Sequence, residues 1–260
     1  MKVSIITVCF NSEKYISDCI DSVNSQSYKD IEHIFIDGNS LDNTTDIIVS
    51  HSKRKTILIS EKDEGIYDAM NKGLQIATGE VIGFLNSDDL FNTDFVVDQL
   101  VNSFESSNID ALWGDLNYVY PSNTKNILRE WRSRELFPND LKKGFIPPHP
   151  SFYIKKSALL LLKSFNKRYS LASDFDFMKR AILCPNIKTN HLSLVVVKMR
   201  AGGTTSNGIS NIIKQNIEII HSLKMSFQEF SYISFVFHKV TNKLQELLSA
   251  LWNRLLGVIK

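Results

Sequence analysis

Short apolar runs alternate with stretches of helical spacing along the first ninety residues. Runs rich in β-branched residues predict four strands, at 3–10, 31–36, 56–59 and 80–85. Between them, apolar residues three and four positions apart predict helices at 15–23, 44–49 and 66–77. Strands separated by helix-length segments pair in parallel through right-handed crossovers. The pattern therefore predicts a doubly wound, mostly parallel α/β sheet.

The second half of the chain has a less regular pattern. It predicts helices at 95–104, 157–162 and 175–183, and strands at 111–120, 127–131, 151–154 and 194–199. Three prolines within 145–150 fix φ and remove backbone donors, so we expect that segment to be irregular. We expect one domain over 1–225, with halves at 1–90 and 91–225, followed by a tail at 226–260.

The tail carries apolar residues at helical spacing from Phe237 to Ile259, over about six turns. Between these residues, Glu246 is the one acid of the stretch. The basic residues that lie off the apolar stripe are Lys239, Lys243, Arg254 and Lys260. Two interpretations of this amphipathic helix are open. It packs on its own domain or on a partner, or it lies on an anionic membrane surface.

Composition excludes several classes of protein. The net charge is +2, so the chain has no overall basic field for nucleic acid. Three cysteines without CxxC spacing argue against a disulfide scaffold or a zinc site and fit a reducing compartment. The sequence shows no signal-peptide pattern and no apolar run of membrane-spanning length. We therefore expect a cytoplasmic protein.

Polar and acidic residues end the fourth predicted strand, where Asn86, Ser87, Asp88 and Asp89 follow the apolar run 81–85. Ligands of open α/β sheets bind beyond the carboxyl ends of strands. Two adjacent carboxylates at such a place can hold a divalent metal, which in turn attracts phosphates. The alternative is a turn in which the aspartates cap the helix that follows.

Two more predicted strands end at acids, Asp37 and Asp63, and the first ends near Thr7 and Asn11. Carboxylates that share one edge repel each other unless a cation or donor-rich ligand compensates. A metal together with a nucleoside or sugar would do so, although turn chemistry also explains Thr7 and Asn11. The glycine patterns of dinucleotide-binding and P-loop proteins are absent, which excludes both classes.

The chain carries five motifs in order: IITVCFN at 5–11, IDGNS at 36–40, DEGIYDAMNKG at 63–73, ATGE at 77–80 and LNSDD at 85–89. Their order and spacing resemble the family 2 glycosyltransferases with the GT-A fold. The similarity covers residues 3–90 and continues more weakly to about 205, through PHPSFY at 148–153 and SDFD at 173–176. The resemblance implies a GT-A-like sheet whose second half forms the acceptor side.

The resemblance implies a nucleotide site at the strand ends. Thr7, Asn11 and Ser87 would face the nucleotide, and Asp37 would accept a hydrogen bond from the base. Asp63 and Gly65 would line the pocket.

The resemblance also implies a metal site in the segment 86–89. Asp88 would hold Mn²⁺ or Mg²⁺ against the diphosphate, and Asp89 would assist at the metal or cap the next helix. Asn86 replaces the first aspartate of the strictest form of the motif, so it keeps an oxygen acceptor but loses the charge.

Asp174 stands where the family has its catalytic base. The usual preceding glutamate is replaced by Ser173, and Asp176 is a second candidate for the base. A helix cap is the alternative role for Asp174. On the acceptor or diphosphate side, the candidates are Asn86, Asp115, His149 and Arg200.

The resemblance implies inverting, metal-dependent transfer of a sugar from a nucleotide-sugar to a glycan or lipid-linked glycan in bacterial surface polysaccharide biosynthesis. We expect a UDP-linked donor, with a GDP-linked donor as second choice. The tail would then contact the inner face of the plasma membrane. Two other functions stay open: a non-catalytic nucleotide- or glycan-binding module and a sugar-1-phosphate nucleotidyltransferase.

Overall fold

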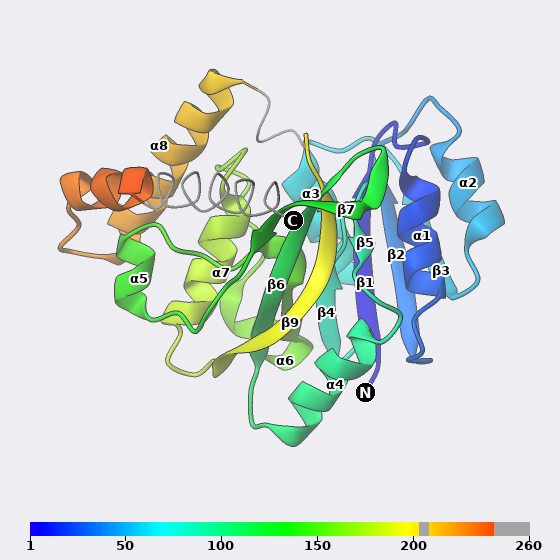
Figure 1. Ribbon diagram of the computed structural model, residues 1–260, viewed down its shortest axis with the longest axis horizontal. Helices are drawn as coiled ribbons and strands as arrows, with labels where there is room; N and C mark the ends of the chain where they lie inside the picture. Colours follow the sequence, from blue (N-terminus) through cyan, green and yellow to red (C-terminus); the bar gives the residue numbers. More distant parts are fainter. Residues whose placement is uncertain (203–207, 242–260) are drawn as a thin grey trace, which may run out of the picture.

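One mixed sheet runs through the part of the chain that the structure describes, residues 1–202 and 208–241 of a computed structural model. In spatial order its strands are β3, β2, β1, β4, β8, β6, β9 and β5, with β7 paired to β6 (Figure 1). The strands are β1 Val3–Cys9, β2 Ile31–Asp37, β3 Lys55–Ser60, β4 Val81–Phe84, β5 Leu90–Phe91, β6 Ala111–Tyr120, β7 Asn123–Trp131, β8 Phe152–Lys155 and β9 Thr189–Arg200.

The first four strands are parallel, as the sequence pattern predicts. β1 pairs with both β2 and β4, and β2 pairs with β3. In register, Cys9 lies beside Asp37, and Asp37 lies beside Ser60. The carboxyl ends of three strands therefore meet at one edge of the sheet, and the predicted doubly wound α/β arrangement is confirmed.

The second half extends the sheet with strands of both directions. β8 runs antiparallel to β4 and to β6, while β6 and β9 are parallel. β9 also pairs antiparallel with β5, the short strand that follows the segment 86–89. The late strand β9 thus returns to the edge where the early strands end.

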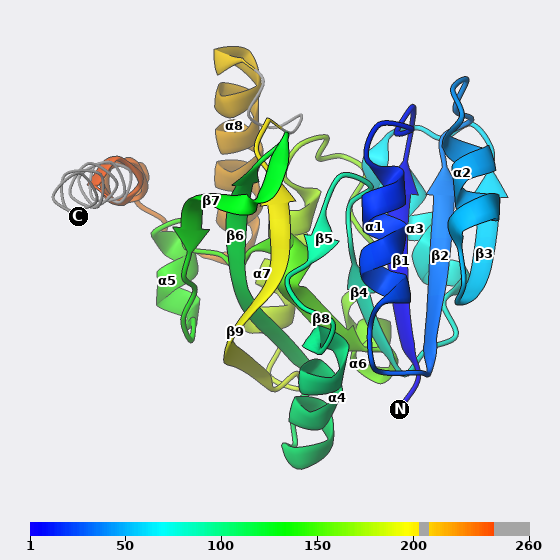
Figure 2. The same cartoon turned by 45° about the vertical axis from the view of Figure 1, so that its right-hand side comes forward.

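Helices cover both faces of the sheet (Figures 1 and 2). On one face, Met70 of α3, Leu162 of α6 and Phe177 of α7 share a buried core with Ile6 of β1. On the other face, α1 and α4 pack in a core that contains Ile5. The helices are α1 Ile16–Asn24, α2 Thr44–His51, α3 Ile66–Ile76, α4 Val96–Ser106, α5 Pro138–Lys142, α6 Lys156–Leu162, α7 Ser173–Leu183 and α8 Ile209–Ser226, with a short 3₁₀ turn η1 at His149–Ser151.

The structure differs from the sequence prediction mainly after residue 130. Helices α5 and α8 were not predicted, and β9 begins at Thr189 rather than at 194. The early part of β9 is polar, so its apolar run reveals only the second half of the strand. For α8 a signal was present, because isoleucines recur at helical spacing from Ile209 onward.

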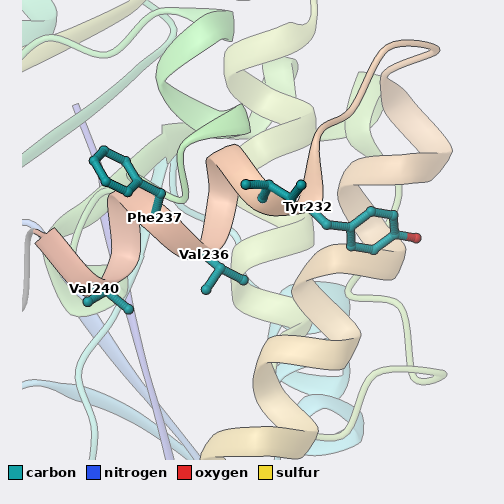
Figure 3. Close-up of a pocket in the computed structure, with 5 residues that line it drawn as sticks. Tyr232, Val236, Phe237 and Val240 are labelled. Carbon is teal, nitrogen blue, oxygen red and sulfur yellow. The ribbon is translucent and has the colours of Figure 1, made fainter.

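The first part of the tail is helical at 232–241 and exposes its apolar side. Phe235 is buried against α7 and α8, whereas Val236, Phe237 and Val240 are exposed. Figure 3 shows the side chains of Tyr232, Val236, Phe237 and Val240 projecting from this helix, where they line an open apolar pocket. The rest of the helix predicted for 237–259 lies outside the described residues. Within the described ranges, no helix has the length and apolar character needed to cross a membrane.

Candidate active site

The loops after β1 and β2 are tied together at the carboxyl edge of the sheet. Asn11 lies at a φ of 48°, a left-handed conformation, which turns the chain toward the next loop. Its backbone N–H donates to Oγ of Ser40 at 2.8 Å, and its Oδ1 accepts from the N–H of Leu41 at 2.9 Å. The exposed Asn11 therefore shapes the predicted nucleotide edge.

Two predicted nucleotide contacts are not brought to the surface of this edge. The side chain of Thr7 points into the sheet face under α1, where its hydroxyl pairs with Nε2 of His33 at 2.9 Å. Asp37 is fully buried, and its Oδ2 accepts from the N–H of Ser40 at 3.0 Å and from the hydroxyl of Ser60 at 2.6 Å. Both side chains are enclosed in this structure, where they hold neighbouring strands and loops together. Contact of Thr7 and Asp37 with a base stays a prediction.

Asp63 lies against the turn after β2. Its Oδ1 accepts from the N–H of Gly65 at 2.9 Å, and Gly65 begins α3 with a φ of 114°. A Cβ on Gly38 would lie 2.7 Å from Oδ2 of Asp63, so a larger residue there would require the Asp63 carboxylate to shift. The same Cβ would lie 3.4 Å from the ring of Phe10, which is 61% exposed. Phe10 is not among the residues predicted from the sequence, although an exposed aromatic ring at a strand end is a signal for base stacking.

The segment 86–89 joins this edge to β9. Ser87 shares a hydrogen bond with Ser12, hydroxyl to hydroxyl, at 3.0 Å. Asp89 is fully buried, and its carboxylate accepts from Nδ2 of Asn86 at 2.8 Å and from the N–H of Arg200 at 3.2 Å. Asp89 therefore closes a turn and anchors β9. Its part in metal binding stays a prediction. Asn86 has a clear structural role as its partner.

Arg200 lies buried beside the predicted metal ligand. Its Nη1 donates to the backbone oxygen of Asp88 at 2.5 Å, and its Nη2 pairs with Asp18. The guanidinium also lies 4.4 Å from the centroid of the Tyr15 ring. Within the described residues, its buried Nε has no hydrogen-bond partner. The buried Arg200 thus places a fixed positive charge next to Asp88, at the carboxyl end of β4.

The carboxylate of Asp88 is half-buried. Burial raises the pKa of Asp88 above its ordinary value, while its own backbone N–H and the charge of Arg200 oppose this rise. Burial and the neighbouring Asp88 raise the pKa of Asp89 further. Positive charge at this place would therefore stabilise the ionised carboxylate.

The donor set fits a metal that is completed by a substrate. Among the described residues, no three His, Cys, Asp or Glu side chains are grouped closely enough to hold a metal by themselves. Asp88 offers one carboxylate at the strand end. Mg²⁺ is commonly held by one or two carboxylates together with substrate phosphates and water, and a site with a single protein carboxylate is compatible with that arrangement.

The candidate base is held on the other side of β4. Asp174 is the second residue of α7, and its half-buried carboxylate accepts a hydrogen bond from the hydroxyl of Tyr67 at 3.0 Å. The residue that caps α7 is Ala172, without a side-chain hydrogen bond. Asp174 is therefore not the cap of its helix, which removes that alternative.

His149 lies between β4 and this base. Its ring stacks on Phe84, the last residue of β4, with 5.3 Å between centroids. Burial lowers the pKa of His149, and the negative charge of Asp174 opposes that change. Phe84 lies two residues before Asn86, so the end of β4 connects the segment that contains Asp88 with the surroundings of Asp174.

The other acidic candidates belong to separate networks. Asp176 is buried and paired with Lys179 at 3.1 Å and with Arg180 at 2.8 Å. Asp115 accepts from the N–H of Ser133 at 2.8 Å and pairs with His191 at 3.1 Å. Both carboxylates hold elements together, so neither is brought to Asp174 or Asp88 as a free group.

Comparisons with known proteins show the family and the fold of this chain. Residues 4–169 match the family model described as Glycosyl transferase family 2. The chain is 28% identical over 213 residues to a "PGL/p-HBAD biosynthesis glycosyltransferase" of Mycobacterium tuberculosis, and the match covers 79% of each chain.

Two solved structures share the fold. TarS 1–349 of S. aureus in complex with UDP superposes with a TM-score of 0.66 at 19% identity and covers 86% of this chain. The mannosyltransferase PcManGT of Pyrobaculum calidifontis, in complex with GDP-Man and Mn²⁺, gives a TM-score of 0.63 at 17% identity and covers 88%. This chain spans 65% of the length of each of those two chains. The likeness shows the GT-A type of fold, and the chain belongs to glycosyl transferase family 2 and is a glycosyltransferase.

Proposed function

We propose that this protein catalyses inverting, metal-dependent transfer of a sugar from a nucleotide-sugar to a hydroxyl of a glycan or lipid-linked glycan in surface polysaccharide biosynthesis. One observation carries the proposal. Gly65, beside Asp63 at the nucleotide edge, begins the helix whose Tyr67 holds Asp174. Residues 63–67 would therefore contact both the donor at that edge and the base on α7.

The nucleotide would lie across the loops after β1, β2 and β3. The exposed ring of Phe10 offers a face for stacking the base, and Asp63 beside it offers acceptors for N–H or O–H groups. Asn11 and Ser87 lie along the same edge. A UDP-linked sugar is the first choice of donor and a GDP-linked sugar the second.

In the proposed reaction, Asp174 takes the proton of the acceptor hydroxyl while the hydroxyl oxygen attacks the anomeric carbon. The new carbon–oxygen bond forms as the bond to the diphosphate breaks, and a single displacement inverts the anomeric centre. Tyr67 orients the carboxylate of Asp174 through the 3.0 Å hydrogen bond. Arg200 holds the backbone of Asp88 beside the leaving group. A divalent metal on Asp88, when bound, would neutralise charge on the departing diphosphate.

A donor screen tests this function. The full chain is incubated with UDP-Glc, UDP-Gal, UDP-GlcNAc and GDP-Man, with Mn²⁺ or Mg²⁺ or with chelator, and release of UDP or GDP is measured. Slow hydrolysis of one donor that depends on metal supports the proposal. Tight donor binding without release would support a binding module instead. Formation of nucleoside triphosphate and sugar-1-phosphate when pyrophosphate is added would support a nucleotidyltransferase.

We further propose that the helix at 232–241 contacts an anionic membrane that carries a lipid-linked acceptor. Ile233, Val236, Phe237 and Val240 are each more than half exposed, so these positions do not pack on their own domain. The sequence continues their apolar spacing to Ile259, with basic residues beside it.

Vesicle flotation tests this contact. The full chain should float with vesicles of phosphatidylglycerol and phosphatidylcholine, and a variant with Ile233→Ser, Phe237→Ser and Val240→Ser should float less. Leu160→Ser on α6 is a matched control, because Leu160 is 81% exposed elsewhere on the surface. Equal flotation of the triple variant and the control would contradict the proposal.

A further inference from the structure

Glu218 of α8 faces the residues that lead into α7. Its Oε1 accepts from the N–H of Ser170 at 3.0 Å and from the Ser170 hydroxyl at 2.9 Å. Its Oε2 accepts from the N–H of Leu171 at 2.8 Å and from the N–H of Ala172 at 3.0 Å. One carboxylate from a distant helix thus binds three successive backbone amides, and both of its oxygens are engaged.

These three amides belong to the N-cap residue of α7, the helix that carries Asp174, and to the two residues before it. Ala172 caps α7, and its side chain cannot accept a hydrogen bond. Backbone N–H groups near the start of a helix need acceptors, and a carboxylate there also interacts favourably with the helix dipole. Glu218 gives an acceptor to the N–H of the N-cap residue Ala172 and to the two N–H groups before it, and its charge lies near the positive end of the α7 dipole. The direction in which α7 starts is therefore set from α8 (Figure 1).

A second, separate network holds α8 against α7. Lys179 donates to the hydroxyl and to the backbone oxygen of Ser222, at 2.7 and 2.8 Å, and Ser222 donates to Asp176 at 2.7 Å. This buried group lies about one turn further along α8 than Glu218. The docking of the two helices and the hold on residues 170–172 are thus carried by different side chains, which can be changed one at a time.

Asp174 is consequently restrained from two sides. Tyr67 bonds its carboxylate, and Glu218 fixes the backbone two to four residues before it. We propose that Glu218 is a positioning residue for the catalytic base: it holds the start of α7 so that the Asp174 carboxylate meets the acceptor hydroxyl. This inference rests on the proposed function, because it takes Asp174 as the base. Glu218 itself touches neither the proposed donor site nor the reacting atoms.

The primary test is Glu218→Gln in the full chain. Glutamine has the same shape, but its NH₂ group would face backbone N–H donors, so one side of the clamp is lost. Small misplacements of a catalytic group cost up to about 100-fold in rate. We expect kcat for metal-dependent UDP release from UDP-GlcNAc, or from the best donor of the screen, to fall about 10- to 100-fold with the donor KM unchanged. Glu218→Asp, which keeps the charge, should recover part of the loss.

Two controls separate positioning from loss of stability. Ser222→Ala weakens the docking of α8 and should lower Tm, but it leaves the contacts of Glu218 in place and should change kcat little. Glu105→Gln, at an exposed glutamate of α4, reports the effect of the same chemical change elsewhere. If Ser222→Ala lowered kcat as much as Glu218→Gln at a comparable loss of Tm, the effect would be structural and the inference would be overturned.

A double-mutant cycle completes the test. With Asp174→Asn as background, Glu218→Gln should lower kcat no further, because the group that it positions is already gone. Additive effects would overturn the inference. Amide exchange gives a readout independent of turnover: Glu218→Gln should raise exchange at residues 170–174, and unchanged exchange there would also overturn it.

The outcomes distinguish this inference from the function on which it rests. Full activity of Asp174→Asn would remove the base assignment together with the inference. An inactive Asp174→Asn combined with an unaltered kcat for Glu218→Gln would leave the function standing and overturn the inference alone.

Discussion

The hydroxyl of Tyr67 donates a hydrogen bond to Oδ1 of Asp174 at 3.0 Å, across 107 residues of sequence. Tyr67 is buried, and burial together with the charge of Asp174 raises its pKa well above the ordinary value for tyrosine. The phenol therefore stays protonated and remains a donor throughout the neutral range. This single bond joins the helix after the nucleotide loop to the helix of the proposed base.

Asp174→Asn should remove most turnover. An amide cannot accept the proton of the acceptor, and positioned base catalysis contributes about 10²- to 10⁴-fold in rate. We expect kcat to fall within that range while UDP binding, measured by calorimetry, is unchanged. Normal turnover of this variant would exclude Asp174 as the base.

Tyr67→Phe should lower kcat less than Asp174→Asn does, again without weakening the binding of the donor. The variant loses one hydrogen bond to a charged group but keeps the packing of the ring against Phe165, whose centroid lies 5.8 Å away. Such a bond contributes about 1.5 to 3 kcal/mol, so kcat should drop roughly 10- to 100-fold with an unchanged donor KM. A higher KM with unchanged kcat would instead assign Tyr67 to donor binding.

Asp88 and Asp89 should behave differently when each is replaced by alanine. Asp88→Ala should keep its Tm and lose the enhancement of UDP binding by Mn²⁺. Asp89→Ala should lower stability, because Asn86 and the N–H of Arg200 each lose a buried partner at about 1 to 3 kcal/mol apiece. Calorimetry with and without Mn²⁺ and thermal unfolding separate the two cases. Loss of metal response in both variants at full stability would show that Asp89 is a ligand after all.

Phe10→Ala should weaken UDP binding about 10-fold, since stacking on an aromatic ring contributes roughly 1 to 3 kcal/mol per base. Phe95→Ala is a matched control, because Phe95 has the same 61% exposure but caps α4. Equal UDP affinities for the two variants would place the base elsewhere.

The stability of the fold should begin to fall below about pH 6.5 because of His33. Burial lowers the pKa of His33 from 6.5 to about 3, so the unfolded chain binds a proton that the folded chain excludes. The stabilising effect is complete above pH 6.5 and is lost as the pH falls from 6.5 toward 3, at up to about 1.4 kcal/mol per pH unit. Urea unfolding between pH 7 and 5 measures the slope. His33→Gln should flatten it, whereas the exposed control His51→Gln should not.

Much of the early half could be predicted from the sequence. The four parallel strands follow from their apolar runs and helix-length spacings, and parallel pairing brings the strand ends together. The burial of Thr7, Asp37 and Asp89 could not be predicted from apolar runs and spacings. Whether a polar residue at a strand end faces the ligand edge or a neighbouring loop depends on partners such as His33, which a motif does not include.

The contacts around Asp174 could not be predicted because their partners lie far apart in the sequence. Glu218 and the amides of 170–172 are separated by 46 to 48 residues, and no periodic pattern connects them. Helix α8 itself escaped the prediction although isoleucines recur along it at helical spacing. Tyr67 lay inside a recognised motif, but its partner could be identified only from the packing of α3 against α7.

The place of β9 in the sheet also means that the contacts of the segment 86–89 are completed late in synthesis. Arg200, at the end of this strand, holds Asp89 and the backbone of Asp88. On the ribosome, the early strands emerge long before this residue, so a nascent chain that ends at 169 would contain the whole family-matched segment and still lack both Arg200 and Asp174. Translation must therefore pass residue 200 before the contacts of Arg200 with Asp88 and Asp89 can form.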